Sequence, residues 1–195
     1  MPKKWMVVAI GALALGGCAT SIAPVEVTRF HLGQPVVAGT VMIEPAPEVD
    51  AKSLEFGTYA AAVSRQLSSI GLTEARTDPG TYSAVVGYTR NSRVAEAKRS
   101  PITIGIGGGT GGGGLGIGLG TSFGIGKAKA KQIIITQLSV QIKRRADQNV
   151  IWEGRTITEA PEGAPAAQPG LAADKLASAL FKGFPGTSGT TITVP

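Results

Sequence analysis

The most constraining feature of the sequence is a long alternating segment at residues 132–145, QIIITQLSVQIKRR. Ile134, Leu138, Val140 and Ile142 share one face, with Thr136 between them, which is the period of a strand with one buried side. A short turn, Asp147-Gln148-Asn149, follows, and residues 150–159 return as a second strand. Two such runs joined by a turn predict an antiparallel hairpin. The chain must therefore build a sheet and cover it.

Other segments supply the rest of the sheet. Strands are predicted at 25–32, 38–44 and 81–90, each bounded by turn signals or by proline. In the last of these, every second residue from Tyr82 to Tyr88 lies on one face. Residues 160–170, rich in proline and glycine, predict a surface linker, and residues 186–195 predict either a loose tail or an edge strand.

Two helices are predicted, each with one apolar stripe. The first is capped by Asp50 or Ser53 and ends at Gly71, a residue type favoured just past a helix end. The second spans 171–182. The first stripe consists of Leu54, Tyr59, Val63, Leu67 and Ile70, and the second of Ala173, Leu176, Ala177 and Leu180. The order of elements predicts an α+β domain, with both helices packed on one face of a mainly antiparallel sheet.

The N-terminus has the three parts of an export signal. Lys3 and Lys4 precede an apolar run at 5–15, and Gly16-Gly17 precede Cys18. The run has 11 residues, fewer than the ~20 that a membrane-spanning helix needs.

Leu15-Gly16-Gly17-Cys18 resembles the lipobox of bacterial lipoproteins. The resemblance implies cleavage before Cys18, a diacylglyceryl group on its thiol and acylation of the new amino group. Several acyl chains together give lasting attachment to a membrane. Ala19 stands where an aspartate would favour retention in the inner membrane, which implies the outer membrane. The alternatives are a cleaved signal with an incidental cysteine, or an uncleaved apolar anchor. Because Cys18 is the only cysteine, lipidation leaves no thiol for a disulfide or a metal.

The charge of the chain is mildly basic. Loss of residues 1–17 removes two of the 19 basic residues, so 17 basic and 13 acidic residues give a mature net charge of +4. Aromatic residues make up 5% of the chain and do not interleave with the basic ones, so nucleic acid is not predicted as a partner. Three basic runs, at 90–99, 127–131 and 143–145, either face anionic lipid headgroups or are ordinary solvated positions.

Several short motifs lie in a shared order along the mature chain. A helix ends in Gly71-Leu72, Y-x-A-x-V-x-Y follows at 82–88, VIWEGRT stands at 150–156 and ALFKGFP at 179–185. This layout resembles the DUF4136 family of bacterial envelope lipoproteins over nearly the whole mature chain. The resemblance implies an exported α+β domain and no established activity.

A glycine-rich tract at 105–126 holds 13 glycines in 22 residues. Gly107, Gly109 and Gly112 fit G-x-G-x-x-G, but no amphipathic helix follows to bind a phosphate. Gly120 to Gly124, with Ser122 at the centre, fits the nucleophile elbow of hydrolases, which needs a histidine downstream. The tract is either a flexible excursion or a hairpin arm. Such an arm would bind a partner, associate with itself or touch the bilayer.

The remaining candidate residues favour packing over chemistry. His31, the only histidine, is predicted to be a partly buried strand residue. Trp152 is predicted to pack against the C-terminal helix, with Phe181 and Phe184 as partners. No catalytic residue, cofactor site or metal site is predicted, so the lipidation site Cys18 stands alone as a predicted functional residue.

The sequence therefore predicts a non-enzymatic lipoprotein of the outer membrane whose domain lies in the periplasm. It would bind or assemble with another envelope protein, or with copies of itself through the glycine-rich arm. The alternative is a carrier that holds a small apolar or lipid-like ligand between sheet and helices. The predicted parts are a signal peptide at 1–17, a lipidated tether at 18–24, a domain at 25–185 containing the insert 105–126, and a tail at 186–195.

Overall fold

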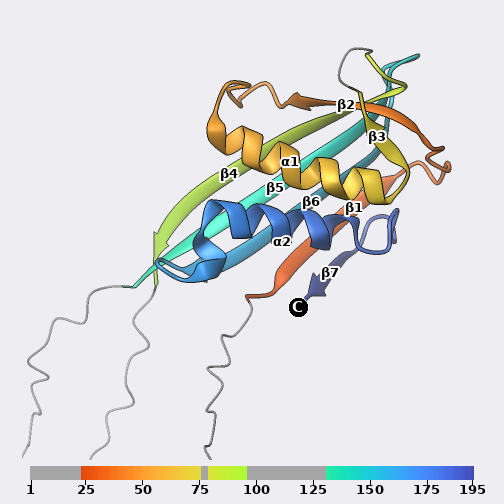
Figure 1. Ribbon diagram of the computed structural model, residues 1–195. Coiled ribbons are helices and arrows are strands. Elements are labelled where there is room, and N and C mark those ends of the chain that lie inside the picture. The colour runs from red at the N-terminus through yellow and green to blue at the C-terminus, as the bar shows by residue number, and fades with distance from the viewer. Residues whose placement is uncertain (1–22, 76–78, 96–130) are drawn as a thin grey trace, which may run out of the picture.

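The computed structural model describes residues 23–75, 79–95 and 131–195. Within these ranges the chain forms a seven-stranded, mostly antiparallel sheet with two helices packed together on one face (Figure 1). The predicted α+β class is confirmed. The sheet order is β3-β2-β4-β5-β6-β1-β7. The elements are β1 Val25–His31, β2 Gly39–Pro45, α1 Leu54–Ser69, β3 Leu72–Glu74, β4 Tyr82–Val94, β5 Gln132–Arg144, β6 Val150–Pro161, the 3-10 helix η1 Pro165–Ala167, α2 Pro169–Phe181 and β7 Thr191–Val194.

The predicted hairpin forms the centre of the sheet. Leu138 lies opposite Thr156 and Val140 opposite Gly154 in the antiparallel pairing of β5 with β6. The turn is stabilised at Asp147, whose Oδ1 accepts a hydrogen bond from the Asn149 backbone N–H at 3.2 Å. β4 pairs with the other side of β5 over 13 residues, so three long strands make one continuous platform.

The first half of the chain adds two parallel strand pairs to the sheet. The prediction of a mainly antiparallel sheet did not specify them. β2 runs parallel to both β3 and β4, and α1 provides the crossover between them. β3 has three residues and was not predicted. Its shortness explains why, because a strand of that length carries no alternation that the sequence could show.

Helix α1 begins and ends where predicted, but one residue of its predicted stripe is wrong. Ser53 is the N-cap, with its Oγ accepting from the Phe56 N–H at 3.4 Å, and Gly71 just beyond the helix has φ +91°. Tyr59, Val63 and Leu67 are fully buried as predicted, whereas Leu54 is 92% exposed. Five residues separate Leu54 from Tyr59, which turns Leu54 about 140° away on a helix of 3.6 residues per turn. Phe56, three residues before Tyr59, takes the buried position instead.

Helix α2 lies beside α1 and is tied to the sheet by aromatic packing. Trp152 stacks on Phe181 with ring centroids 5.3 Å apart and packs against Phe184 at 5.2 Å, as predicted. The indole N–H donates to the Pro185 carbonyl at 3.0 Å. Ala173, Leu176, Ala177 and Leu180 are all completely buried, so the predicted stripe of this helix is confirmed.

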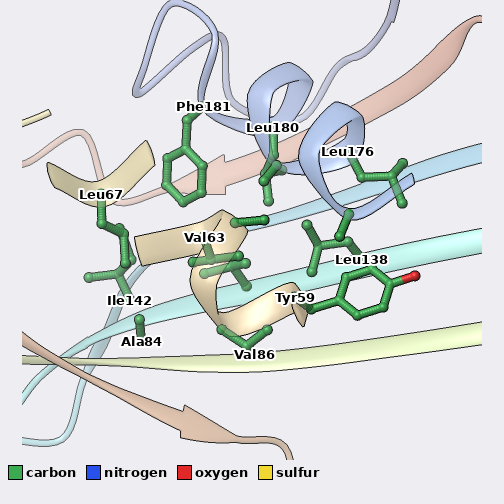
Figure 2. Packing of buried hydrophobic residues seen from close by; sticks show 14 of the residues in the cluster. Tyr59, Val63, Leu67, Ala84, Val86, Leu138, Ile142, Leu176, Leu180 and Phe181 are labelled. Atoms are coloured by element: carbon green, nitrogen blue, oxygen red, sulfur yellow. The ribbon is translucent and has the colours of Figure 1, made fainter. Parts of the chain in front are cut away.

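The layer between helices and sheet is filled with side chains. Figure 2 shows Tyr59, Val63 and Leu67 of α1 and Leu176 and Leu180 of α2 pointing toward the strands. On the strand side they meet Val86 and Leu138, both completely buried. The carrier alternative predicted a ligand between sheet and helices, and apolar side chains occupy this space.

The C-terminal part contains regular structure where the sequence predicted a surface linker and, as one alternative, a loose tail. β6 continues to Pro161, and Ala160 and Ala167 are buried within the predicted linker 160–170. In the predicted tail, β7 pairs antiparallel with β1, which confirms the edge-strand alternative. The described residues include no helix with the length and apolar character needed to cross a membrane.

Candidate functional site

The helices leave the other face of the sheet uncovered, and its alternate residues come together there in rows. One row runs across β4, β5, β6 and β1, and the next row lies two residues further along each strand. The rows are Val85-Gln141-Glu153-Phe30 and Gly87-Ser139-Arg155-Thr28. The pairing register alone brings these eight residues together, since they come from widely separated parts of the chain.

A groove of about 510 Å³ lies over these two rows. Its side wall is the segment Ala46-Pro47-Glu48, which follows β2. Ala46 is held down by a hydrogen bond from its N–H to the Val86 carbonyl at 2.9 Å. Gly87 keeps the floor low, because a Cβ there would lie 2.8 Å from Ser139 Oγ and 3.2 Å from Ala46 Cβ.

The groove presents charged groups without ion-pair partners. Glu48, Glu153 and Arg155 line it, and none of them forms a salt bridge with another residue in the described ranges. Gln141 Nε2 donates to Glu153 Oε2 at 3.3 Å, which holds that carboxylate in the floor. Phe30 adds an aromatic ring that is 50% exposed. The arrangement suits a polar ligand or chain segment that brings its own charges and a flat apolar surface.

Among the described residues, the serine of the groove and the histidine of the chain lie on opposite faces of the sheet. The Ser139 hydroxyl donates to the Gly87 carbonyl at 3.3 Å. His31 belongs to the face of β1 that also carries Arg29, which is the helix side of the sheet. Its Nδ1 accepts from the Gly33 N–H, and its Nε2 lies 3.1 Å from the Gly186 carbonyl oxygen. The predicted description of His31 as a partly buried strand residue is confirmed.

The other predicted candidates have different outcomes. Cys18, Ser122 and the whole glycine-rich tract 105–126 lie outside the described residues. Among the residues that are described, no group of three or more His, Cys, Asp or Glu side chains is placed to hold a metal ion. No candidate cofactor site was predicted, and the groove is the described feature that best suits a ligand.

The basic runs at 90–99 and 143–145 are largely neutralised where the structure describes them. Arg93 pairs with Glu159 at 2.5 Å and Arg144 with Asp147 at 2.9 Å. Arg90 lies 3.9 Å from Glu55, and Arg145 pairs with Glu44. Local carboxylates therefore take up the arginines that sequence analysis left open as lipid contacts.

The groove was not predicted from the sequence. Its polar residues were treated as the outward positions of half-buried strands, which are usually just solvated. The signal available in the sequence was the mixed character of that face, where Val85, Gly87 and Phe30 stand among polar residues. Glu48 could not be assigned, because it lies in a connection whose path over the sheet depends on tertiary structure.

Comparison with known proteins finds an uncharacterised relative of this chain. No family model matches it. The uncharacterized protein ZMO1243 of Zymomonas mobilis is 32% identical to this chain, and the alignment covers 97% of this chain and 86% of the relative. The chain belongs to the same family as ZMO1243. Membership of the DUF4136 family remains a prediction.

Solved structures are similar to this chain at low sequence identity. A PDZ domain protein from Parabacteroides distasonis matches 88% of this chain and 39% of its own, with 10% identity and a TM-score of 0.50. The PelC dodecamer from Paraburkholderia phytofirmans matches 79% of this chain and 93% of its own, with 9% identity and a TM-score of 0.43. A minor lipoprotein from Acinetobacter baumannii matches 73% and 89%, with 10% identity and a TM-score of 0.39. The similarity to the Parabacteroides distasonis protein concerns the fold alone.

Proposed function

We propose that this protein is a lipid-anchored binding protein of the bacterial envelope, without enzymatic activity, whose groove holds part of an envelope partner. The observation that carries the proposal is the set of Glu48, Glu153 and Arg155 around a 510 Å³ hollow on the uncovered sheet face. The arginines of β4 and β5 form salt bridges with neighbouring carboxylates. Glu48, Glu153 and Arg155 form no salt bridge with another described residue, so their charges are available to an external partner.

The arrangement favours binding over catalysis. The groove is open along the sheet, so it does not exclude water from a reacting group. Its hydroxyl, Ser139, is bonded to a backbone carbonyl rather than to a base. An elongated ligand, such as an extended peptide or a polar polymer, fits a hollow that crosses four strands.

The envelope location rests on the N-terminal sequence. The basic start, the apolar run 5–15 and Leu15-Gly16-Gly17-Cys18 support export, cleavage and lipidation of Cys18. Ala19 supports the outer membrane, with the domain in the periplasm. The likeness of the motifs at 82–88 and 150–156 to the DUF4136 family supports the same location.

The partner-binding role is tested by capture from membranes with matched variants. The groove variant carries Glu153→Gln and Arg155→Gln. The control carries Arg65→Gln and Asp174→Asn, an exposed acid and arginine on the helix side of the domain. Recovered proteins are quantified by mass spectrometry. The groove variant should lose a partner by about tenfold or more while the control keeps it. Equal recovery by both variants would refute the groove as the binding surface.

The glycine-rich arm is the alternative binding element and is tested in the same way. A variant lacking residues 105–126 should keep any partner that depends on the groove. If this deletion removes the partner and the groove variant does not, the arm carries the interaction.

The anchor is tested separately with Cys18→Ser. The variant should leave the membrane fraction or accumulate as an unprocessed chain, because no acceptor thiol remains. Unchanged fractionation and unchanged mass would contradict lipidation.

A further inference from the structure

The start of the described chain is fixed to the domain. Thr158 Oγ1 donates to the Pro24 carbonyl at 3.0 Å, and Lys175 Nζ of α2 donates to the Ala23 carbonyl. The next residue, Val25, is completely buried opposite Thr158. The chain therefore leaves the domain at a defined point between β6 and α2.

The distance from this point to the anchor is short. Five residue steps separate Ala23 from Cys18. A fully extended chain spans at most ~3.6 Å per residue, so the lipidated residue lies within about 18 Å of Ala23. This inference rests on the proposed lipidation of Cys18. Given that lipidation, the end of the domain that carries Ala23 must lie close to the bilayer.

Several elements that are distant in the sequence begin or end at this same end of the domain. β4 ends there and β5 begins there, since Val94 lies opposite Gln132. Both helices begin there. The Tyr88 and Ser53 hydroxyls lie 3.5 Å apart at the start of α1, and Arg90 Nη2 donates to the Ala167 carbonyl just before α2. Figure 1 shows the start of β1 at the same end as the left-hand ends of α1 and α2.

Three large apolar side chains are exposed at this end, all on the helix side. Leu54 is the first residue of α1 and is 92% exposed, Val94 ends β4 and is 61% exposed, and Leu171 in the first turn of α2 is 51% exposed. The nearby Arg90 and Arg93 are close to Glu55 and Glu159. Carboxylates thus neutralise these two arginines, and the exposed side chains of Leu54, Val94 and Leu171 are apolar. Such groups enter the boundary between headgroups and acyl chains.

We infer that this end of the domain, through Leu54, Val94 and Leu171, rests on the lipid surface in which Cys18 is anchored. The groove then stands away from the membrane. Glu153 lies five residues along β6 from Thr158, about 17 Å at the rise of a strand. A partner in the periplasm would reach the groove from the side while the tether end stays on the lipid.

The experiment uses engineered cysteines in the full lipidated protein. Leu54→Cys probes the tether end, and Val37→Cys is the matched control. Val37 is an exposed apolar residue, 65% exposed, in the connection that enters β2 at the opposite end. Each variant is labelled with an environment-sensitive fluorophore. It is then reconstituted in phosphatidylethanolamine and phosphatidylglycerol vesicles carrying nitroxide-labelled lipids. We expect several-fold stronger quenching at position 54 than at position 37, and equal or reversed quenching overturns the inference.

Two further measurements separate the anchor from the contact. Wild-type protein labelled under the same conditions reports on Cys18. If that thiol reacts, the proposed lipidation fails. If it stays silent and positions 54 and 37 are quenched equally, the surface contact alone fails. A chain with roughly ten Gly and Ser residues inserted between Ala19 and Thr20 loosens the tether. Quenching at position 54 should persist in that chain. If it falls to the level at position 37, the tether end was only held near the lipid by the short tether and did not contact it.

Discussion

At the level of single residues, Gly154 of β6 has no room for a side chain where it faces α2. A Cβ there would lie 2.6 Å from Leu180 Cδ1 and 2.6 Å from Trp152 Cη2. Gly154→Ala should therefore lower the free energy of unfolding by about 1–3 kcal/mol, since both neighbours are completely or almost completely buried and cannot move freely. Urea denaturation followed by tryptophan fluorescence measures the loss.

Gly57 provides the matched control for that substitution. It lies within α1, and a Cβ there would meet nothing within 4 Å. Gly57→Ala should raise the free energy of unfolding by about 0.5–1 kcal/mol, because alanine restricts the unfolded chain and favours the helix. If both substitutions destabilise equally, the steric argument at Gly154 fails.

Tyr59 is a buried residue with an unusual proton affinity. Its side chain is completely buried, it stacks on Tyr88 at 4.4 Å, and its hydroxyl has no hydrogen-bond partner among the described residues. Burial, helped by the Glu55 carboxylate, raises the pKa of Tyr59 to about 12. The folded protein therefore holds this proton more tightly than the unfolded chain, whose tyrosine pKa is about 10.

Stability should accordingly fall as the pH rises from about 10 toward 12, since the unfolded state loses the proton first. Tyr59→Phe removes that part of the fall. At neutral pH it should leave stability unchanged or raise it by about 1 kcal/mol, because a buried hydroxyl without a partner is lost. Urea midpoints of both proteins between pH 7 and 11.5 test this. A difference that stays constant with pH would contradict the raised pKa.

At the scale of elements, Arg29 joins β1 to the end of α2. Its guanidinium is buried and donates to the carbonyls of Leu180, Ala179 and Lys182 at 2.8–3.0 Å. These are carbonyls at the helix C-terminus, where the backbone lacks partners and favours positive charge. Burial lowers the pKa of this arginine. The carbonyls compensate for part of the desolvation that causes the shift.

Arg29→Met should therefore destabilise the protein by about 2–3 kcal/mol, since three hydrogen bonds to a charged group are lost. Arg29→Lys should recover little of the loss, because an ammonium group cannot reproduce the fork of the guanidinium. Hydrogen exchange of the last turn of α2 measures where the loss occurs. Full rescue by lysine would show that charge alone matters.

Element predictions succeeded where a segment's own pattern was strong. The strands at 132–145 and 150–159 were predicted within two residues, because alternation over ten or more positions is specific to strands. Leu54 was assigned to the wrong face because a stripe spaced five, four and four residues was treated as one side of a helix. The three-residue spacing between Phe56 and Tyr59 was the better indication of the buried face.

At the scale of the whole molecule, the described sheet is complete without the glycine-rich tract. β4 and β5 pair over 13 residues up to Val94 and Gln132, and the pairing continues with the Ala95 N–H bonded to the Lys131 carbonyl. Deletion of residues 105–126 should therefore keep the fold. The shorter connection should leave stability unchanged or raise it by about 1 kcal/mol, through its lower closure entropy. Circular dichroism and urea denaturation test this, and loss of cooperative unfolding would contradict it.

The kind of sheet, the central hairpin, the two helices and the aromatic partners of Trp152 could all be predicted from the residues alone. The strands and helices follow from residues close together along the chain or from a simple apolar period, and the partners of Trp152 from the few aromatic residues that the sequence offers. Three other features emerge only in the folded chain: the parallel pairing of β2, the groove around Glu153, and the position of Leu54, Val94 and Leu171 at one end. Each of these depends on strand order and register, which bring together residues separated by many positions. No local pattern records a contact of that kind, because its free energy comes from the whole sheet and the two helices that cover one side of it.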